Sequence, residues 1–144
     1  MIVPFYKQEF WFSCFVACVR MILEYYGIKK SERELRPLLR VTPHATGLWF
    51  FVELGLESMG LHFHRGFGFS LDELRELVKN NTPLIVSLKF SEKHPNHTVV
   101  VTDITDKSII VHDPDLGPNI RINVKQFLEA WSKRKHIAGF IKRG

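Results

Sequence analysis

The sequence predicts one α+β domain over residues 1–144, with an N-terminal helical part packed on a C-terminal, mostly antiparallel sheet. Apolar residues recur at helical spacing early in the chain, as over 15–23. From about residue 61 onward they alternate with polar residues or form short β-branched runs. A chain of 144 residues is also long enough to bury a hydrophobic core without disulfides or a structural metal.

Start and stop signals define the predicted helices. Five helices are predicted, over 14–26, 31–39, 48–59, 70–80 and 124–131. Ser13 is the expected N-cap of the first helix, and Gly27 is its stop. Capping boxes at 31–34 and 70–73 open the second and fourth helices. Pro37 is placed near the beginning of its helix, where it need not break it, and the third helix is apolar enough to be largely buried.

Short runs bounded by turn residues predict the strands. Six strands are predicted, over 61–64, 84–88, 98–102, 108–111, 120–122 and 136–141. Residues 106–107 form a tight turn, so the third and fourth strands are expected to pair as a hairpin. Residues 3–7 are extended, with Pro4 suited to a strand edge. Loops are expected at 41–47, 92–96 and 113–118.

Charge and hydropathy argue against several classes of protein. The net charge is +5 with a pI near 9.4, but the basic residues are dispersed, which argues against a nucleic acid partner. The densest basic segments, 133–135 and 142–143, are expected to be a solvated end. No apolar run reaches the roughly 18 residues that cross a bilayer, and the N-terminus lacks a signal-peptide pattern. We therefore expect a cytoplasmic chain with no integral membrane segment and with reduced cysteines.

Cys14 is the predicted nucleophile. An irregular loop over 8–13 delivers it to the first turn of a helix, where unpaired N–H groups and the helix dipole favour thiolate over thiol. Most free cysteines are structural, and Cys18, one turn further along the apolar face, fits that role. Gln8 is an uncharged donor able to point its amide at an oxyanion beside the backbone N–H of Cys14.

A base and its orienting carboxylate are predicted on the hairpin. His97 opens the third predicted strand, and Asp113 follows the fourth. Pairing about the turn at 106–107 places both at the same end of the sheet. A cysteine nucleophile needs such an imidazole and carboxylate. His112 points to the opposite face of its strand and is a poor base for the same site.

Two other residue pairs were weighed as metal ligands. Cys14 and Cys18 are one helical turn apart, a spacing unusual for a closed zinc site and poor for a disulfide. His62 and His64 share one face of a strand, but no third ligand lies near them in the sequence. We predict neither a metal site nor a cofactor.

Several segments carry a resemblance to a known family. They are Val3 with Pro4, Gln8 with Cys14, Ala17 with Cys18 and Met21, and the segments 25–27, 97–101, 113–117 and 127–131. In order and spacing they resemble the bacteriocin-processing double-glycine peptidases, which are papain-like cysteine peptidases and often form the N-terminal domain of an ABC exporter. The resemblance implies a papain-like fold with Cys14 as nucleophile, His97 as general base and Asp113 as its orienter. It also implies Gln8 in the oxyanion hole with the N–H of Cys14.

The chain departs from the family pattern beside the nucleophile. Ser13 and Phe15 stand where aspartate and glycine are common, and the aromatic residue puts the shape of the substrate cleft in question. No transmembrane helix or phosphate-binding loop follows. We therefore expect a free-standing relative that acts on a peptide or protein substrate, with a separately encoded ABC exporter as a candidate partner.

Two functions compete at this point. The first is a cysteine endopeptidase that cleaves a peptide or leader segment, after paired glycines if the resemblance extends to specificity. The second is a module with the same fold that binds a peptide or leader without cutting it. The aromatic side chains of Phe10, Trp11 and Phe12 suit either role, and the four catalytic positions favour the enzyme. Thiol redox chemistry or metal binding through both cysteines is a third, weaker alternative.

Overall fold

The computed structural model describes residues 1–92 and 96–142, so parts of the predicted loop 92–96 and of the basic segment 142–143 lie outside the described residues. The elements in chain order are α1 (Cys14–Tyr25), α2 (Glu32–Leu38), α3 (Trp49–Glu57), β1 (His62–Gly66), α4 (Leu71–Lys79), β2 (Leu84–Leu88), β3 (His97–Ile104), β4 (Ser108–Asp113), β5 (Gly117–Asn123), α5 (Val124–Ser132) and β6 (Ala138–Lys142). The predicted α+β class is confirmed.

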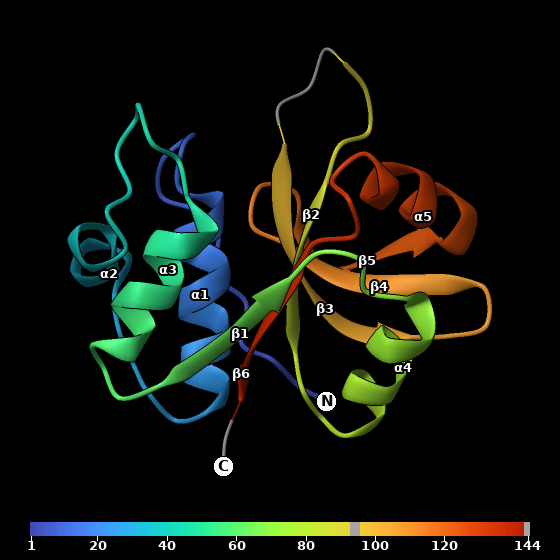
Figure 1. The fold of residues 1–144 in the computed structure, drawn as a ribbon, viewed down its shortest axis with the longest axis horizontal. Coiled ribbons are helices and arrows are strands. Elements are labelled where there is room, and N and C mark those ends of the chain that lie inside the picture. The colour runs from blue at the N-terminus through green and yellow to red at the C-terminus, as the bar shows by residue number, and fades with distance from the viewer. Residues whose placement is uncertain (93–95, 143–144) are drawn as a thin grey trace.

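One antiparallel sheet forms the centre of the fold. Its strand order is β1-β6-β2-β3-β4-β5. Helices α1, α2 and α3 lie on one side of the sheet, and α4 and α5 lie on the other (Figure 1). The predicted hairpin is present, with Ile104 of β3 opposite Ile109 of β4. The predicted extended segment 3–7 belongs to no strand.

Buried apolar side chains form one cluster on each face of this sheet. Alternation along β3 sends Val100 into the cluster built around α1, and Val99 and Val101 into the cluster under α4 and α5. Cys18 is fully buried in the first cluster, as its apolar neighbours predicted. α1 is therefore packed firmly against the strand that begins with His97.

The two ends of α1 differ in how well they follow local sequence signals. At its C-terminus, Gly27 has φ +84°, and Ile28 N–H donates to Leu23 O at 2.9 Å, which is a Schellman motif. At its N-terminus, the Ser13 side chain makes no cap. Its hydroxyl instead accepts from the N–H of Phe10 and donates to the carbonyl of Phe10, both at 3.0 Å. Ser13 is buried and closes the preceding turn, although Phe10 and Trp11 of that turn are exposed.

Two further expectations for the helices were wrong in detail. Both capping boxes are present, but Pro37 lies in the last turn of α2, because the helix ends one residue later. α3 is less buried than its composition suggests, because it covers the sheet with one side only. Val52 and Leu56 are buried, whereas Phe50 and Leu54 are 52% and 37% exposed.

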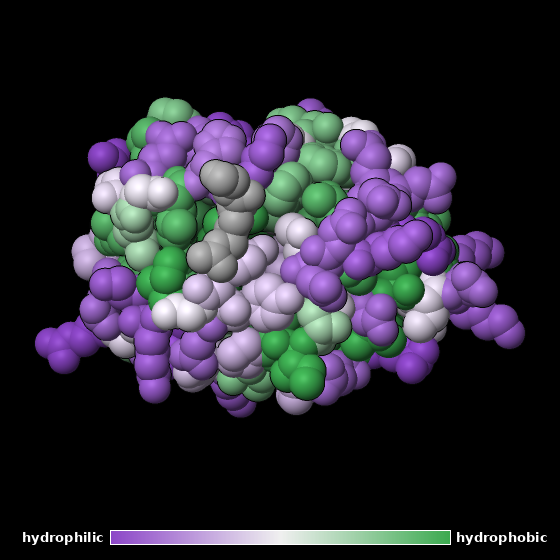
Figure 2. All heavy atoms as spheres, turned by 90° about the horizontal axis from the view of Figure 1, so that it is seen from below, coloured by the Kyte–Doolittle hydropathy of each residue, from purple (hydrophilic) through white to green (hydrophobic). Residues whose placement is uncertain are grey.

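The starts of α1 and β3 lie at the same end of the molecule (Figure 1). The opposite end is shown in Figure 2, where hydrophilic side chains cover much of the surface and apolar side chains form separate spots among them. Among the described residues, no helix is long and apolar enough to cross a membrane. The candidate site is therefore sought where α1 and β3 begin.

Candidate active site

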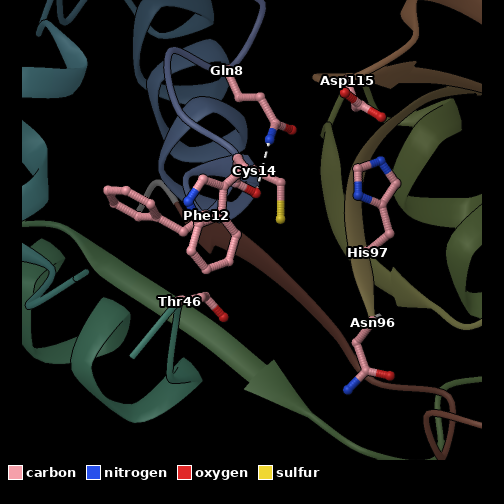
Figure 3. Close-up of a pocket in the computed structure, with 8 residues that line it drawn as sticks. Gln8, Phe12, Cys14, Thr46, Asn96, His97 and Asp115 are labelled. Atoms are coloured by element: carbon pink, nitrogen blue, oxygen red, sulfur yellow. Dashed lines mark hydrogen bonds between the residues drawn. The ribbon is translucent and has the colours of Figure 1, made fainter. Parts of the chain in front are cut away.

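A pocket of about 260 Å³ lies where the loop before α1 faces the start of β3. Its lining residues are Gln8, Trp11, Phe12, Cys14, Thr46, Asn96, His97 and Asp115 (Figure 3). Three of the four predicted site residues therefore line one pocket. The fourth, Asp113, contacts His97 from behind.

Cys14 is the first residue of α1, and its sulfur points into the space that His97 faces from across the pocket (Figure 3). Burial raises the pKa of the Cys14 thiol, but hydrogen bonds from His97 and from the hydroxyl and backbone N–H of Thr98 outweigh it. The pKa therefore lies below its ordinary value. These interactions, rather than helix position alone, favour the thiolate.

His97 and Asp113 form a short ion pair, with 2.6 Å between His97 Nε2 and Asp113 Oδ1. Burial lowers the pKa of His97, but the hydrogen bonds with Asp113 and Cys14 raise it to about 10. The same oxygen of Asp113 accepts the backbone N–H groups of Asp115 and Leu116 at 2.9 and 3.1 Å. Burial raises the pKa of Asp113, but these donors and His97 lower it overall. An imidazolium is thus held against a fixed carboxylate.

The orientation of the imidazole follows from this pairing. Since Nε2 is directed to Asp113, Nδ1 is the nitrogen on the side of Cys14, as Figure 3 shows. The sulfur, the imidazole and the carboxylate therefore stand in series. Such a series can attack a carbonyl carbon and then deliver a proton to the leaving group.

Gln8 lies beside Cys14, but its amide is already engaged. Its Nε2 donates to the carbonyl of Phe10 at 2.9 Å and to that of Trp11 at 3.2 Å. A side-chain amide has two N–H hydrogens, so both are directed at the backbone in this structure. Gln8 Oε1 is buried and has no hydrogen-bond partner among the described residues. The residue is in the predicted place, yet its donor is not aimed into the pocket.

Phe15 does not obstruct the cleft. It is buried, and its ring meets that of Trp49 edge-on with 4.7 Å between centroids. A Cβ added at Gly47, whose φ is +143°, would lie 2.8 Å from Phe15 Cδ2. The loop that carries Thr46 to the pocket therefore rests directly on Phe15. The aromatic residue after the nucleophile supports the wall of the cleft from beneath.

The other histidines lie away from this pocket. His112 is buried, with Nε2 donating to the carbonyl of Val3 at 2.7 Å and Nδ1 accepting from the N–H of Asn119 at 3.2 Å. It is a structural residue, as its orientation on the strand predicted. His62 and His64 are exposed neighbours on β1. Within residues 1–92 and 96–142, no group of three or more potential ligands is arranged to hold a metal ion.

Two residues near the site were missed in the sequence. Thr98 donates to Cys14 Sγ at 3.2 Å, and its signal was a hydroxyl directly after His97, at the start of the buried apolar run 99–101. Glu32 is fully buried, accepts the N–H of Glu9 at 3.0 Å and pairs with Arg36 at 3.3 Å. Glu32 holds the loop that carries Gln8. In the sequence it lies inside the capping box at 31–34, which predicts a helix start exposed to solvent. No local pattern distinguishes it.

The chain is similar to known proteins in sequence and in fold. The model of the peptidase C39 family matches residues 3–138. The chain belongs to this family. The predicted family resemblance and the assignment to the cysteine peptidases are therefore confirmed.

Two curated proteins match most of the chain. The pediocin PA-1 transport/processing ATP-binding protein of Pediococcus acidilactici is 28% identical over 125 residues, which is 84% of this chain. The lactococcin-G-processing and transport ATP-binding protein of Lactococcus lactis subsp. lactis is 30% identical over 123 residues, or 83% of this chain. The aligned region is 16% of each relative's length.

A solved structure confirms the papain-like fold class. The double glycine motif protease from an AMS/PCAT transporter, in complex with its leader peptide, superposes with a TM-score of 0.81. The alignment covers 99% of this C39 chain and 93% of the other, at 20% identity. At that identity the likeness concerns the fold.

Proposed function

We propose that this C39 domain, over residues 1–144, is a cysteine endopeptidase whose catalytic residues are Cys14, His97 and Asp113. The observation that carries the proposal is the series of sulfur, imidazole and carboxylate at one open pocket, with 2.6 Å between His97 Nε2 and Asp113 Oδ1. The lowered pKa of Cys14 and the raised pKa of His97 favour the thiolate–imidazolium pair that attack requires.

The reaction proceeds by acyl transfer. The Cys14 thiolate attacks the scissile carbonyl carbon and forms a C–S bond, while the carbonyl electron pair moves to oxygen. The His97 imidazolium gives its proton to the leaving amine as the C–N bond breaks, which leaves a thioester. Neutral His97 then takes a proton from water, whose oxygen attacks the thioester and expels the thiolate. Asp113 keeps the ring in position and stabilises its charged form.

The oxyanion needs donors near Cys14. As the first residue of α1, Cys14 has a backbone N–H without an intrahelical partner. Gln8 supplies the second donor if substrate releases one of its bonds to the carbonyls of Phe10 or Trp11. Its position in the pocket wall supports this role.

The substrate we propose is a peptide or leader segment with paired glycines before the cut. The curated relatives are named as processing and transport proteins, and the solved double glycine motif protease was captured with its leader peptide. A separately encoded ABC exporter is the partner we propose. Action before export, together with the need for a reduced Cys14, supports a cytoplasmic location.

The test compares two peptides that differ in the residues before the cut. A double-glycine peptide and its double-leucine analogue are incubated with the wild-type protein and with Cys14→Ala, and products are identified by mass spectrometry. Faster cleavage of the glycine peptide by the wild type alone is the expected result. Equal binding by both proteins without cleavage would instead establish the peptide-binding module.

A further inference from the structure

Thr98 contacts the sulfur of Cys14 from the sheet. It follows His97 on β3, and its Oγ1 lies 3.2 Å from Cys14 Sγ in donor geometry. The residue is 6% exposed and shares the face of β3 that packs on α1, as Val100 does. Because threonine is branched at Cβ, its hydroxyl has few accessible orientations in such a packed strand. The contact is therefore a fixed feature of the fold.

We propose that Thr98 is a further catalytic residue, whose hydroxyl donates a permanent hydrogen bond to the Cys14 sulfur and holds it as a thiolate facing His97. The proposal deepens the proposed function of this site and rests on it. It gives the nucleophile two side-chain donors of different kinds. Once the His97 ring loses its proton, it no longer donates a hydrogen bond to the sulfur. The hydroxyl of Thr98 does not titrate and keeps its proton.

Among the described residues, the titratable groups that face this sulfur are Cys18, His97, Asp113 and Asp115. Cys18 lies one turn deeper on α1, and burial raises its pKa well above the usual value; the hydroxyl of Thr98 also interacts with its sulfur but offsets this rise only in part, so Cys18 is a neutral thiol. His97 faces the sulfur from β3, and Asp113 of β4 stands behind it. Asp115 lines the same pocket from the turn after β4. The hydroxyl of Thr98 is thus the uncharged side-chain donor among the described groups that contact this sulfur.

Such a donor has two opposed effects on reactivity. It lowers the pKa of the thiol, so more thiolate is present at a given pH. It also withdraws charge from sulfur, and the nucleophilicity of a thiolate falls with its pKa, with a Brønsted coefficient of about 0.4–0.5. Removing the hydroxyl should therefore leave less thiolate at neutral pH, but each thiolate should react faster. A merely structural contact would not produce this pairing.

The test measures the rate of alkylation of Cys14 by iodoacetamide as a function of pH. Thr98→Val keeps the side-chain shape and removes the hydroxyl, and Thr98→Ser is the matched control that keeps it. Peptide mapping separates Cys14 from buried Cys18, which should label slowly in every variant. We expect Thr98→Val to raise the pH midpoint by about one unit. Its plateau rate at high pH should rise about threefold.

Thr98→Ser is the control, and two results would contradict the proposal. Thr98→Ser should restore the wild-type midpoint and plateau. An unchanged midpoint in Thr98→Val, or a raised midpoint that Thr98→Ser shares, would overturn the proposal. If Thr98→Val fails the check of folding by circular dichroism, Thr98→Ala replaces it with the same expected midpoint shift.

The assay needs no peptide substrate, so its result is independent of the proposed cleavage. A protein that cuts no peptide but shows the Thr98 effect would retain the assigned thiolate donor and lose the proposed peptidase function. A protein that cuts the double-glycine peptide without any Thr98 effect would keep the proposed peptidase function and lose the assigned role of Thr98.

Discussion

The backbone N–H of Gln8 donates to the carbonyl of Pro114 at 2.9 Å. This bond joins the loop before the nucleophile directly to the turn after Asp113. On its other side the same loop is held by the N–H of Glu9, which donates to Glu32 at 3.0 Å. The oxyanion side of the site and its acid–base side are therefore held together by main-chain contacts as well as by side chains.

The site residues should contribute unequally to the rate. Cys14→Ala should abolish cleavage of a double-glycine peptide, and His97→Ala should nearly do so. Gln8→Ala should lower kcat by roughly 10²- to 10³-fold, as expected for a lost oxyanion donor. Asp113→Ala should fall between His97→Ala and the wild type, because an unoriented imidazole keeps some basicity. Steady-state kinetics on purified variants checks this order, and full activity in Cys14→Ala would contradict the mechanism.

Activity and alkylation should diverge at high pH. His97 has a pKa of about 10, and its proton is needed by the leaving amine. Values of kcat/KM should therefore fall above about pH 10, whereas alkylation of Cys14 should not fall, because thiolate persists there. Parallel pH profiles of both rates test this. A joint decline of both would indicate unfolding instead of titration of His97.

The ion pair also makes stability depend on pH. The pKa of His97 is raised above 6.5, so its contribution is full below 6.5 and is lost as pH rises toward about 10. The pKa of Asp113 is lowered below 3.8, so its contribution is present above 3.8 and is lost at lower pH. The loss in the free energy of unfolding caused by Asp113→Asn should thus be largest between pH 3.8 and pH 6.5, where both groups are charged. Urea unfolding at several pH values measures it, and a loss that does not change with pH would argue against the pair.

Gly47 should tolerate no side chain. In Gly47→Ala the new Cβ would lie 2.8 Å from Phe15 Cδ2, in a backbone conformation with φ +143°. Gly60→Ala is the matched control, since φ is +79° there and nothing lies within 4 Å. The free energy of unfolding should fall about 1–3 kcal/mol further in Gly47→Ala than in the control. Only Gly47→Ala should also lower kcat/KM, because its loop carries Thr46 to the pocket. Equal urea midpoints for the two variants would refute this.

Glu32 should matter more to stability than its neighbour on the same helix. Glu32→Ala removes the buried acceptor of the Glu9 N–H and one of the two carboxylates that pair with Arg36, which should cost about 1–3 kcal/mol in urea unfolding. Glu34→Ala removes an exposed capping-box acceptor at Ser31 and should cost clearly less than Glu32→Ala. Similar losses in the two variants would mean that Glu32 contributes no more than a cap.

Sequence patterns predicted what depends on near neighbours. The run 84–88 is apolar except for Ser87 and is bounded by Pro83 and Lys89, and β2 occupies that range. The hairpin and the meeting of His97 with Asp113 followed from one turn and antiparallel register. These features need no knowledge of distant segments.

Features set by distant segments could not be predicted. Thr98 meets Cys14 because α1 packs on β3, and no spacing in the chain encodes that contact. Glu32 is buried because a loop more than twenty residues earlier folds over it. The bonds of Gln8 depend on where the carbonyls of Phe10 and Trp11 point in an irregular turn.

The position of β6 between β1 and β2 bears on how the enzyme forms. Gly66 of β1 pairs with Ala138 of β6, and β6 also pairs with β2. Closing a loop of that length costs entropy before any contact compensates, so the sheet should complete late in folding. Cys14 is synthesised early, but the sheet that carries His97 is completed only when β6 pairs with β1 and β2. A chain in which β6 has not yet paired should therefore have an incomplete sheet behind its site, and its Cys14 should be less activated than in the folded protein.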